Sequence, residues 1–157
     1  MCGIVGYLGE KEKKEILIEG LGELEYRGYD SAGIAVMAGE ELRHFKAVGK
    51  LENLKRKAEN FESEGYGVAI GHTRWATHGK PTELNAHPHS GAFSYVVHNG
   101  IIENYQQIRE RLEKEGVNFL SQTDTETIVH LFEYAIKRGM DPHEAFVETI
   151  GELEGAF

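Results

Sequence analysis

The sequence predicts an α+β or layered α/β domain, because short apolar runs fill its first half and helical periodicity fills its second half. Its 157 residues are enough for one domain with a core of its own. Glycine, at 19 residues, lies mostly in turns between the apolar runs, and the hydrophobic share of 40% is ordinary for a globular protein.

The first hundred residues are expected to form strands separated by helices. Apolar runs bounded by turn residues predict strands at 2–8, 32–37, 42–48, 67–72 and 93–98. Leucines that recur on one face predict a helix over 11–25, and the charged segment 51–61 is expected to be a second helix. Residues 38–41 are a candidate hairpin turn, so the strands on either side of it should pair.

The rest of the chain is expected to be mainly helical. A first helix is predicted by apolar residues in a 4-3-4 spacing: Ile101, Tyr105, Ile108 and Leu112. A second is predicted by the apolar residues between 128 and 136, and it should begin with a capping box of Thr123 and Glu126.

A last helix should begin with Asp141 as N-cap, Pro142 at the first helical position and Glu144 three residues after the cap. Gly155 is expected to end it, and Ala156 with Phe157 to start a further strand. We therefore expect the chain to be a fragment that is incomplete at its C-terminus.

Charge argues against several classes of partner. The chain carries 17 basic and 26 acidic residues, a net charge of −9, whereas nucleic acids and anionic membranes bind basic surfaces. No stretch approaches the roughly 20 apolar residues of a membrane span, and no basic segment precedes the first apolar run, as it would in a signal peptide. We expect a cytoplasmic protein that binds neither nucleic acid nor membrane.

Cys2 is the only cysteine, and it becomes the first residue once Met1 is removed. It cannot form an internal disulfide. A single cysteine also argues against a structural zinc site built from cysteine ligands. A thiolate is a strong nucleophile, and a free α-amine on the same residue is a potential general base. The plain alternative is an inert residue in a strand.

Two polar motifs in the first half are candidate site segments. Residues 27–33, RGYDSAG, combine a cation, an anion and a hydroxyl with glycines, and their plain interpretation is a turn with a surface ion pair. Residues 71–79, GHTRWATHG, follow an apolar strand, so Arg74 should lie at a strand end, where its planar fork can hold a carboxylate. Trp75 can wall a pocket there, or it can pack in a core or an interface.

Histidines also invite a metal hypothesis. Those near the second motif are His72, His78, His87 and His89. Their spacing matches no helical zinc pattern and no carboxylate ligands are obvious nearby, so loop histidines are the favoured interpretation. No metal and no other cofactor is expected.

Two further motifs lie in the second half. At 98–104, HNGIIEN, a side-chain amide of Asn99 and the N–H of Gly100 can form an oxyanion hole, although Asn-Gly is also a common turn. At 121–126, SQTDTE, Asp124 should fall in the first turn of a helix, where the dipole favours a carboxylate. Its functional interpretation is a counter-ion for a substrate ammonium, which with Arg74 would select a free amino acid.

Taken in order, these motifs resemble the N-terminal-nucleophile (class II) glutamine amidotransferases over nearly the whole chain. The matching segments are CGIVGY at 2–7, RGYDSAGIAV at 27–36, GHTRWATHG at 71–79, HNGIIENY at 98–105 and SQTDTETI at 121–128. Within the class, the residues at 29–30, 75–78 and 101–104 resemble the aminosugar-forming branch more than the branches of purine or asparagine synthesis.

The resemblance implies a role for each matching residue. Cys2 would attack the side-chain amide of glutamine with its own α-amine relaying the proton, while Asn99 and Gly100 stabilise the oxyanion. Arg74 and Asp124 would bind the carboxylate and ammonium of glutamine. Thr77 and His78 would line the same pocket. Trp75 would gate the passage of ammonia, and Arg27 would lie in the motif beside the nucleophile.

The resemblance also implies a four-layer αββα sandwich over 1–157, with its C-terminal part missing. Family members continue into sugar-isomerase domains in cis, and we expect a homodimer at full length. Two alternatives stay open from the residues themselves. One is the glutaminase domain of another class II amidotransferase or an amidohydrolase on the same scaffold, and the other is a non-catalytic module that binds an amino acid.

Overall fold

The computed structural model describes residues 2–28, 30–76 and 79–157. The chain divides into two compact units, Met1–Pro88 and His89–Phe157. Each unit has a hydrophobic core of its own, one centred on Leu17, Leu21 and Ile34, the other on Ile102, Leu112 and Leu131.

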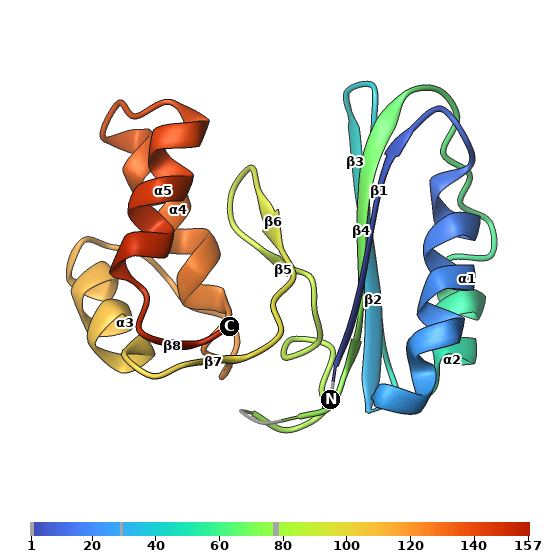
Figure 1. Cartoon of the computed structure of the whole chain (residues 1–157), viewed down its shortest axis with the longest axis horizontal. Coiled ribbons are helices and arrows are strands. Elements are labelled where there is room, and N and C mark those ends of the chain that lie inside the picture. The colour runs from blue at the N-terminus through green and yellow to red at the C-terminus, as the bar shows by residue number, and fades with distance from the viewer. Residues whose placement is uncertain (1, 29, 77–78) are drawn as a thin grey trace. The chain divides into compact units, whose positions relative to one another are not determined.

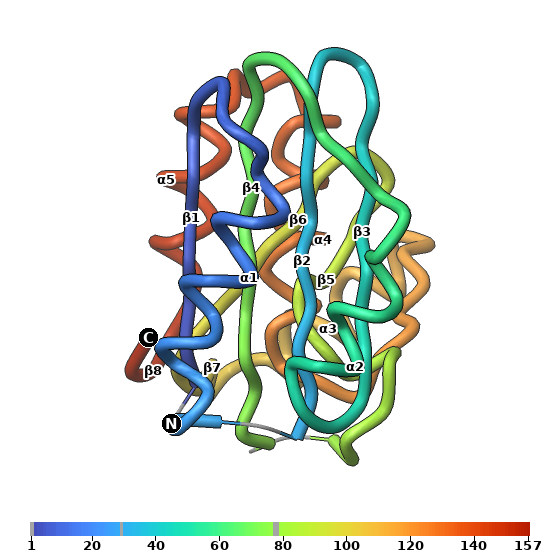
Figure 2. Tube along the Cα trace, turned by 90° about the vertical axis from the view of Figure 1, so that its right-hand side faces the viewer, coloured from blue at the N-terminus to red at the C-terminus, as the bar shows by residue number. Residues whose placement is uncertain are grey.

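The first unit is built on an antiparallel sheet with the strand order β1-β4-β2-β3 (Figure 2). Its strands are β1 (Gly3–Gly9), β2 (Ser31–Ala38), β3 (Glu41–Val48) and β4 (Gly67–Arg74). The four strands predicted in this region are confirmed, and their ends shift by one or two residues. The predicted hairpin is also confirmed, because β2 and β3 pair from Ala38 and Glu41 onward.

Two helices, α1 (Lys13–Leu24) and α2 (Leu51–Lys57), cover one face of this sheet (Figure 1). A short 3₁₀ helix, Glu25–Arg27, follows α1. Alternation along the strands sends every second side chain toward the helices, as with Ile34 and Val36 of β2. Helix α2 ends at Lys57, before the predicted limit at 61.

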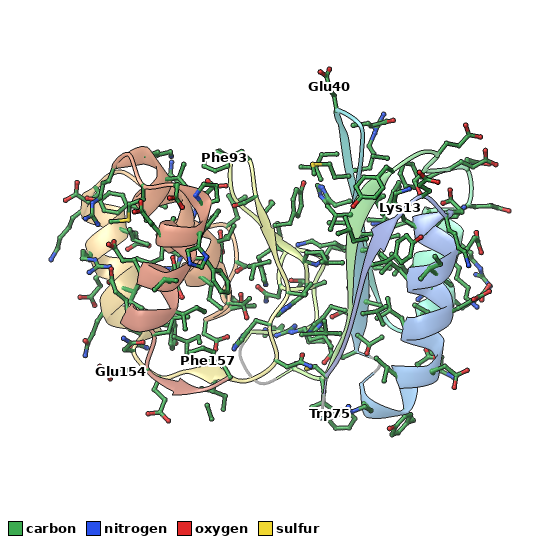
Figure 3. The ribbon with its side chains drawn as sticks, turned by 45° about the horizontal axis from the view of Figure 1, so that its top comes forward. Lys13, Glu40, Trp75, Phe93, Glu154 and Phe157 are labelled. Atoms are coloured by element: carbon green, nitrogen blue, oxygen red, sulfur yellow. The ribbon has the colours of Figure 1, made fainter. Side chains whose placement is uncertain are left out.

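Lys13 lies fully buried at the start of α1, and Figure 3 labels it beside the sheet. Its ammonium donates to the carbonyl oxygens of Lys11 and Ser63, each at 3.2 Å, and to that of Gly65. A buried charge is tolerated when its hydrogen-bonding capacity is filled, and three acceptors match the three N–H bonds of an ammonium. This lysine therefore ties the loop before β4 to α1.

The loop 85–88 lies against the opposite face of the sheet. A Cβ on Gly33 of β2 would stand 2.0 Å from the carbonyl oxygen of His87, so only glycine permits this approach. Lys46 of β3 donates to the carbonyls of Ala86 at 2.8 Å and Pro88 at 3.2 Å. The position of the loop thus depends on the absence of a side chain at Gly33 in β2 and on the long side chain of Lys46 in β3.

The second unit consists of helices joined by short strand pairs. In chain order its elements are β5 (His89–Ser90), β6 (Tyr95–Val96), β7 (Ile101–Ile102), α3 (Tyr105–Lys114), α4 (Glu126–Lys137), α5 (Pro142–Glu152) and β8 (Gly155–Ala156). Strand β5 pairs with β6, and β7 pairs with β8, both antiparallel. A strand at the end of the chain is confirmed by β8, but it begins at Gly155, and α5 ends at Glu152 and not at Gly155 as predicted.

Several predicted boundaries in this unit are wrong. Ile101 does not begin a helix, because residues 101–102 pair with β8 and α3 starts only at Tyr105. The strand predicted over 93–98 is reduced to Tyr95–Val96. The capping box of Thr123 and Glu126 does not form, since Thr125 is the N-cap of α4.

The structure also bears on the predicted start of the last helix and on membrane-spanning segments. The capping box of Asp141 and Glu144, with Pro142 in the first turn of α5, is confirmed. Among the residues described, the structure contains no helix with the length and apolar character needed to span a membrane.

Candidate active site

Cys2 lies immediately before β1, at the end of the sheet where β4 finishes. Its Sγ accepts a hydrogen bond from the backbone N–H of Trp75 at 3.1 Å and lies 3.5 Å from the carbonyl oxygen of the same residue. The register that pairs Gly3 with Thr73 produces this proximity. The first and third motifs of the sequence therefore meet, although they are seventy residues apart.

Arg74, the last residue of β4, is only 3% exposed. Its guanidinium donates to the carbonyl of Gly79 at 3.1 Å and to that of Lys80 at 3.4 Å. Its Nη1 also lies 3.9 Å from Oδ1 of Asp30. These partners hold the guanidinium at the end of the strand, as predicted from the sequence. Its planar fork is suited to binding a carboxylate.

Asp30 positions the segment that contains Arg74. Its carboxylate accepts from the backbone N–H of Ala76, and its own N–H donates to the carbonyl of Arg74 at 3.1 Å. The hydroxyl of Ser31 donates to Oδ1 of Asp30 at 2.9 Å. A turn with a surface ion pair, the plain interpretation of this motif, is therefore wrong.

Gly28 contributes to the same contact. A Cβ at this position would lie 2.9 Å from the carbonyl carbon of Arg74 and 3.0 Å from the nitrogen of Trp75. The motif at 27–33 thus packs its backbone against residues 74–76. Sequence reasoning selected Arg27, which lies partly buried in the 3₁₀ helix, and missed Asp30, whose only signal was its place in the same motif.

Trp75 is 51% exposed, so the interpretation that it packs in the core is wrong, whereas packing in an interface stays a prediction. Figure 3 shows it at the end of the sheet. Thr77 and His78, the next predicted pocket residues, lie outside the described residues, as does Met1.

The loop interpretation is wrong for two of the histidines, because His72 lies in β4 and His89 lies in β5. The rings of His72 and His87 stack with centroids 4.0 Å apart. Within residues 2–28, 30–76 and 79–157, no group of three or more His, Cys, Asp or Glu side chains is arranged to hold a metal ion.

In the second unit, Asn99 and Gly100 form the corner between β6 and β7. Gly100 has φ +138°, and a Cβ on it would lie 2.3 Å from the carbonyl oxygen of Ala156. The corner therefore requires glycine for both its conformation and its contact with β8. Asn99 is partly buried, and Gly100 is exposed.

Asp124 lies close to this corner. It is 3% exposed, and its Oδ2 accepts the backbone N–H of Ile102 at 2.8 Å. It was predicted in the first turn of a helix, but α4 begins two residues later, at Glu126. The carboxylate consequently supports β7 instead of capping its own helix.

His98 and Glu126 are site neighbours that sequence reasoning did not select. Nδ1 of His98 lies 2.9 Å from the hydroxyl of Thr125. Burial lowers the pKa of His98, and the nearby Asp124 carboxylate opposes that effect. Burial raises the pKa of Glu126, but hydrogen bonds from His130, Leu120 and Ser121 outweigh it and bring the pKa to about 2.

The predicted site residues therefore form two groups. The first unit brings together Cys2, Arg74 and Trp75, and the second brings together Asn99, Gly100 and Asp124. The first group offers a thiol and a buried cation at the same end of the sheet. The second offers hydrogen-bond donors beside a buried carboxylate.

Comparison with known proteins gives consistent matches. A sequence model of the family described as "Glutamine amidotransferase domain" matches residues 55–146. The whole chain is 69% identical to the glutamine–fructose-6-phosphate aminotransferase (isomerizing) of Campylobacter jejuni subsp. jejuni and 57% identical to that of Helicobacter pylori. The Escherichia coli K12 enzyme of the same name is 49% identical. The chain spans 26% of the length of each of these relatives.

Solved structures agree with the fold. One similar structure is that of glutamine phosphoribosylpyrophosphate amidotransferase of B. subtilis, complexed with ADP and GMP. The similarity covers 99% of this chain and 34% of that chain, with a TM-score of 0.83 and 29% sequence identity. A structure described as the allosteric regulatory enzyme of purine biosynthesis has a TM-score of 0.85 over the same shares, also at 29% identity. The predicted fold class, an α+β sandwich of the N-terminal-nucleophile type, is confirmed by this similarity.

Proposed function

This chain belongs to the glutamine amidotransferase domain family, and on that premise we propose that it hydrolyses L-glutamine to glutamate and ammonia with Cys2 as nucleophile. The observation that carries the proposal is the 3.1 Å contact between Sγ of Cys2 and the N–H of Trp75, the residue that directly follows the buried Arg74 in the chain. A nucleophile and a cation suited to an amino-acid carboxylate thus lie at one end of one sheet.

The chemistry proceeds in two steps once Met1 has been removed. The α-amine of Cys2 takes the thiol proton as sulfur attacks the side-chain carbonyl carbon of glutamine. That proton passes to the departing nitrogen, the C–N bond breaks, and ammonia leaves behind a γ-glutamyl thioester. Water, deprotonated by the same amine, then attacks the thioester, and glutamate leaves as the C–S bond breaks and the proton returns to sulfur.

Both ends of the substrate have assigned partners in this proposal. Arg74 binds the α-carboxylate and Asp124 the α-ammonium, so an enzyme with both charges selects a free amino acid. The amide of Asn99 and the N–H of Gly100 donate to the oxyanion of the tetrahedral intermediate. The resemblance also leads us to assign Thr77 and His78 to the pocket, Trp75 to the gating of ammonia and Arg27 to the support of the nucleophile.

The destination of the ammonia follows from the relatives. They are glutamine–fructose-6-phosphate aminotransferases, and this chain corresponds to 26% of their length. We propose that the complete protein carries sugar-isomerase domains in cis, acts on fructose 6-phosphate to make glucosamine 6-phosphate, and works as a cytoplasmic homodimer. Finding a sugar-isomerase sequence after Phe157 would support this destination against another class II amidotransferase.

The test uses the full-length protein with Cys2→Ala. Glutamine-dependent product formation should disappear, whereas formation from added ammonia should continue, because the substitution removes only the ammonia source. Glutamine hydrolysis retained in this variant contradicts the proposal.

A second measurement separates an enzyme from a binding module. A glutamine-analogue electrophile should add one mass adduct to this domain, at Cys2, which is its only cysteine. Excess L-glutamine should slow that labelling. Binding of glutamine without any adduct and without turnover would favour the non-catalytic module.

A further inference from the structure

The segment 98–102, which contains the two proposed oxyanion donors, is held at both ends by consecutive residues of the loop before α4. Thr125 contacts His98 at one end, with 2.9 Å between Oγ1 and Nδ1. Asp124 accepts the N–H of Ile102 at the other end, at 2.8 Å. Asn99 and Gly100 are the corner between these two anchors.

Both anchors are buried. Thr125 is 1% exposed, His98 is 8% exposed and Asp124 is 3% exposed. A hydrogen bond shielded from water has no solvent competitor and keeps its geometry more strictly than an exposed one. The remaining backbone of the corner is held by β8, since Ile101 pairs with Ala156 and Ile102 with Gly155.

The loop that supplies the anchors is itself rigidly held. Glu126 accepts from the N–H groups of Leu120 and Ser121, and the hydroxyl of Thr127 donates to the carbonyl of Asp124 at 2.6 Å. The anchor residues are therefore part of a connected hydrogen-bond network that starts from helix α4.

We propose that Thr125 and His98 are positioning residues, whose hydrogen bond orients the Asn99–Gly100 corner for the oxyanion of the proposed glutaminase reaction. This inference rests on the proposed function. The proposal assigns neither side chain a direct contact with the substrate. Their contribution arises only as negative charge develops on the carbonyl oxygen, because a donor displaced by a fraction of an ångström stabilises that charge less.

A transition-state effect has a distinct kinetic pattern. Loss of an oxyanion donor lowers kcat by about 10²–10³-fold, so loosening a donor that is still present should cost about 10-fold. Ground-state binding at the charged ends of glutamine should not change. Alkylation of Cys2 by iodoacetamide should not change either, since displacement at a saturated carbon forms no oxyanion.

The experiment compares full-length Thr125→Val with Thr149→Val. Thr149 is a matched control because it is 1% exposed and its hydroxyl makes one buried hydrogen bond, to the carbonyl of Ala145 within α5. Each variant is assayed for glutamine kcat and KM, glutamate Kd, the iodoacetamide rate and the melting temperature. We expect about 10-fold lower kcat for Thr125→Val alone, with KM, Kd and alkylation changed by less than about 2-fold.

Conservative replacements provide the second arm. Thr125→Ser keeps the hydroxyl and should restore kcat to within about 2-fold of wild type. His98→Asn keeps a polar atom near the position of Nδ1 and should retain more kcat than His98→Leu. Combining Thr125→Val with His98→Leu should lower kcat little more than either alone, since both remove the same hydrogen bond.

The outcomes separate the two proposals. If the wild-type protein does not hydrolyse glutamine, the proposed function and this inference fall together. If it does, the inference alone is overturned when Thr125→Val behaves like Thr149→Val, when KM and glutamate Kd rise in step with the loss of kcat, or when Thr125→Ser fails to restore activity. Should Thr125→Val not fold, the same criteria apply to His98→Leu against His98→Asn.

Discussion

Asp30 and Arg74 hold each other through both side chain and main chain. Oδ1 of Asp30 lies 3.9 Å from Nη1 of Arg74, and the N–H of Asp30 donates to the carbonyl of Arg74 at 3.1 Å. The second oxygen of the carboxylate accepts from Ala76. One acidic residue therefore determines both the charge balance at the guanidinium and the path of the chain on either side of Trp75.

Replacing Asp30 with asparagine should weaken substrate binding more than turnover. Asparagine keeps an oxygen that can accept from Ala76, but it removes the negative charge beside Arg74. We expect the KM for glutamine to rise about 10-fold with kcat changed less, and the free energy of unfolding to fall by about 1–2 kcal/mol. Steady-state kinetics and denaturant unfolding of the full-length variant measure both.

The control for this prediction is Glu41→Gln. Glu41 pairs with Arg43 in an exposed ion pair, and such pairs contribute little, so stability should change by less than about 0.5 kcal/mol. Equal effects of the two substitutions would contradict the role assigned to Asp30.

Gly33→Ala should be strongly destabilising. The added methyl would meet the carbonyl oxygen of His87 at 2.0 Å, and main-chain atoms cannot rotate away as a side chain can. We expect a loss of about 3 kcal/mol or more, seen as a lower midpoint of denaturant unfolding. Gly22→Ala, inside α1 with only an ordinary contact at 3.8 Å, should instead be neutral or stabilising by up to about 1 kcal/mol.

Most of the sheet could be predicted because its strands are apolar runs bounded by turns. The short pairs β5–β6 and β7–β8 could not, since two-residue strands carry no periodic signal and depend on distant partners. Ile101 shows the difficulty clearly. Its spacing to Tyr105 fits a helix, but pairing with Ala156 overrides the local preference.

Candidate site residues could be proposed from the sequence where a residue type itself suggests chemistry. Cys2, Arg74 and Asp124 were selected on those grounds, and each has a built environment in its unit. Asp30 and Thr125 were missed as individual residues, because their importance lies in which backbone and side chains they contact. Such contacts are tertiary and leave no mark in composition or spacing.

Lys13→Met should destabilise the first unit although methionine has a similar length. The substitution removes the donor for three carbonyl oxygens, and the lysine side chain that it replaces is fully buried. We expect a loss of about 3 kcal/mol in the free energy of unfolding and faster hydrogen exchange over residues 63–66. Lys55→Met on the exposed side of α2 is the control and should change stability by less than about 0.5 kcal/mol.

Glu126 should make the free energy of unfolding depend on pH in the acidic range. Its pKa in the folded chain is about 2, below the ordinary 4.5, so the ionised carboxylate stabilises the fold. That stabilisation is complete above about pH 4.5 and is lost as the pH falls toward 2. A shift of this size corresponds to about 3 kcal/mol.

The measurement is the free energy of unfolding as a function of pH for wild type and Glu126→Gln. The variant should be less stable at pH 7, and its deficit should shrink as the pH approaches 2. Glu110→Gln, on an exposed position of α3, should follow the wild-type curve. A deficit that stays constant from pH 7 to 2 would show that the ionised form is not the stabilising one.

Asn104 connects the corner at Gly100 to the last strand of the chain. Its Nδ2 donates to the carbonyl of Glu152 at 2.8 Å, and its Oδ1 accepts the N–H of Glu154 at 3.0 Å. Asn104→Asp removes the donor and sets a carboxylate oxygen against a carbonyl oxygen, while the acceptor for Glu154 remains. We expect amide hydrogen exchange to quicken about 10-fold over 101–104 and 154–156, since a lost hydrogen bond costs about 1.4 kcal/mol of local opening energy.

Asn53→Asp is the matched control, because Asn53 also donates to a carbonyl, that of Val48 at 2.9 Å, but in the first unit. It should leave exchange at 101–104 unchanged, and an equal effect of both variants there would mean that Asn104 does not hold β7 and β8 together.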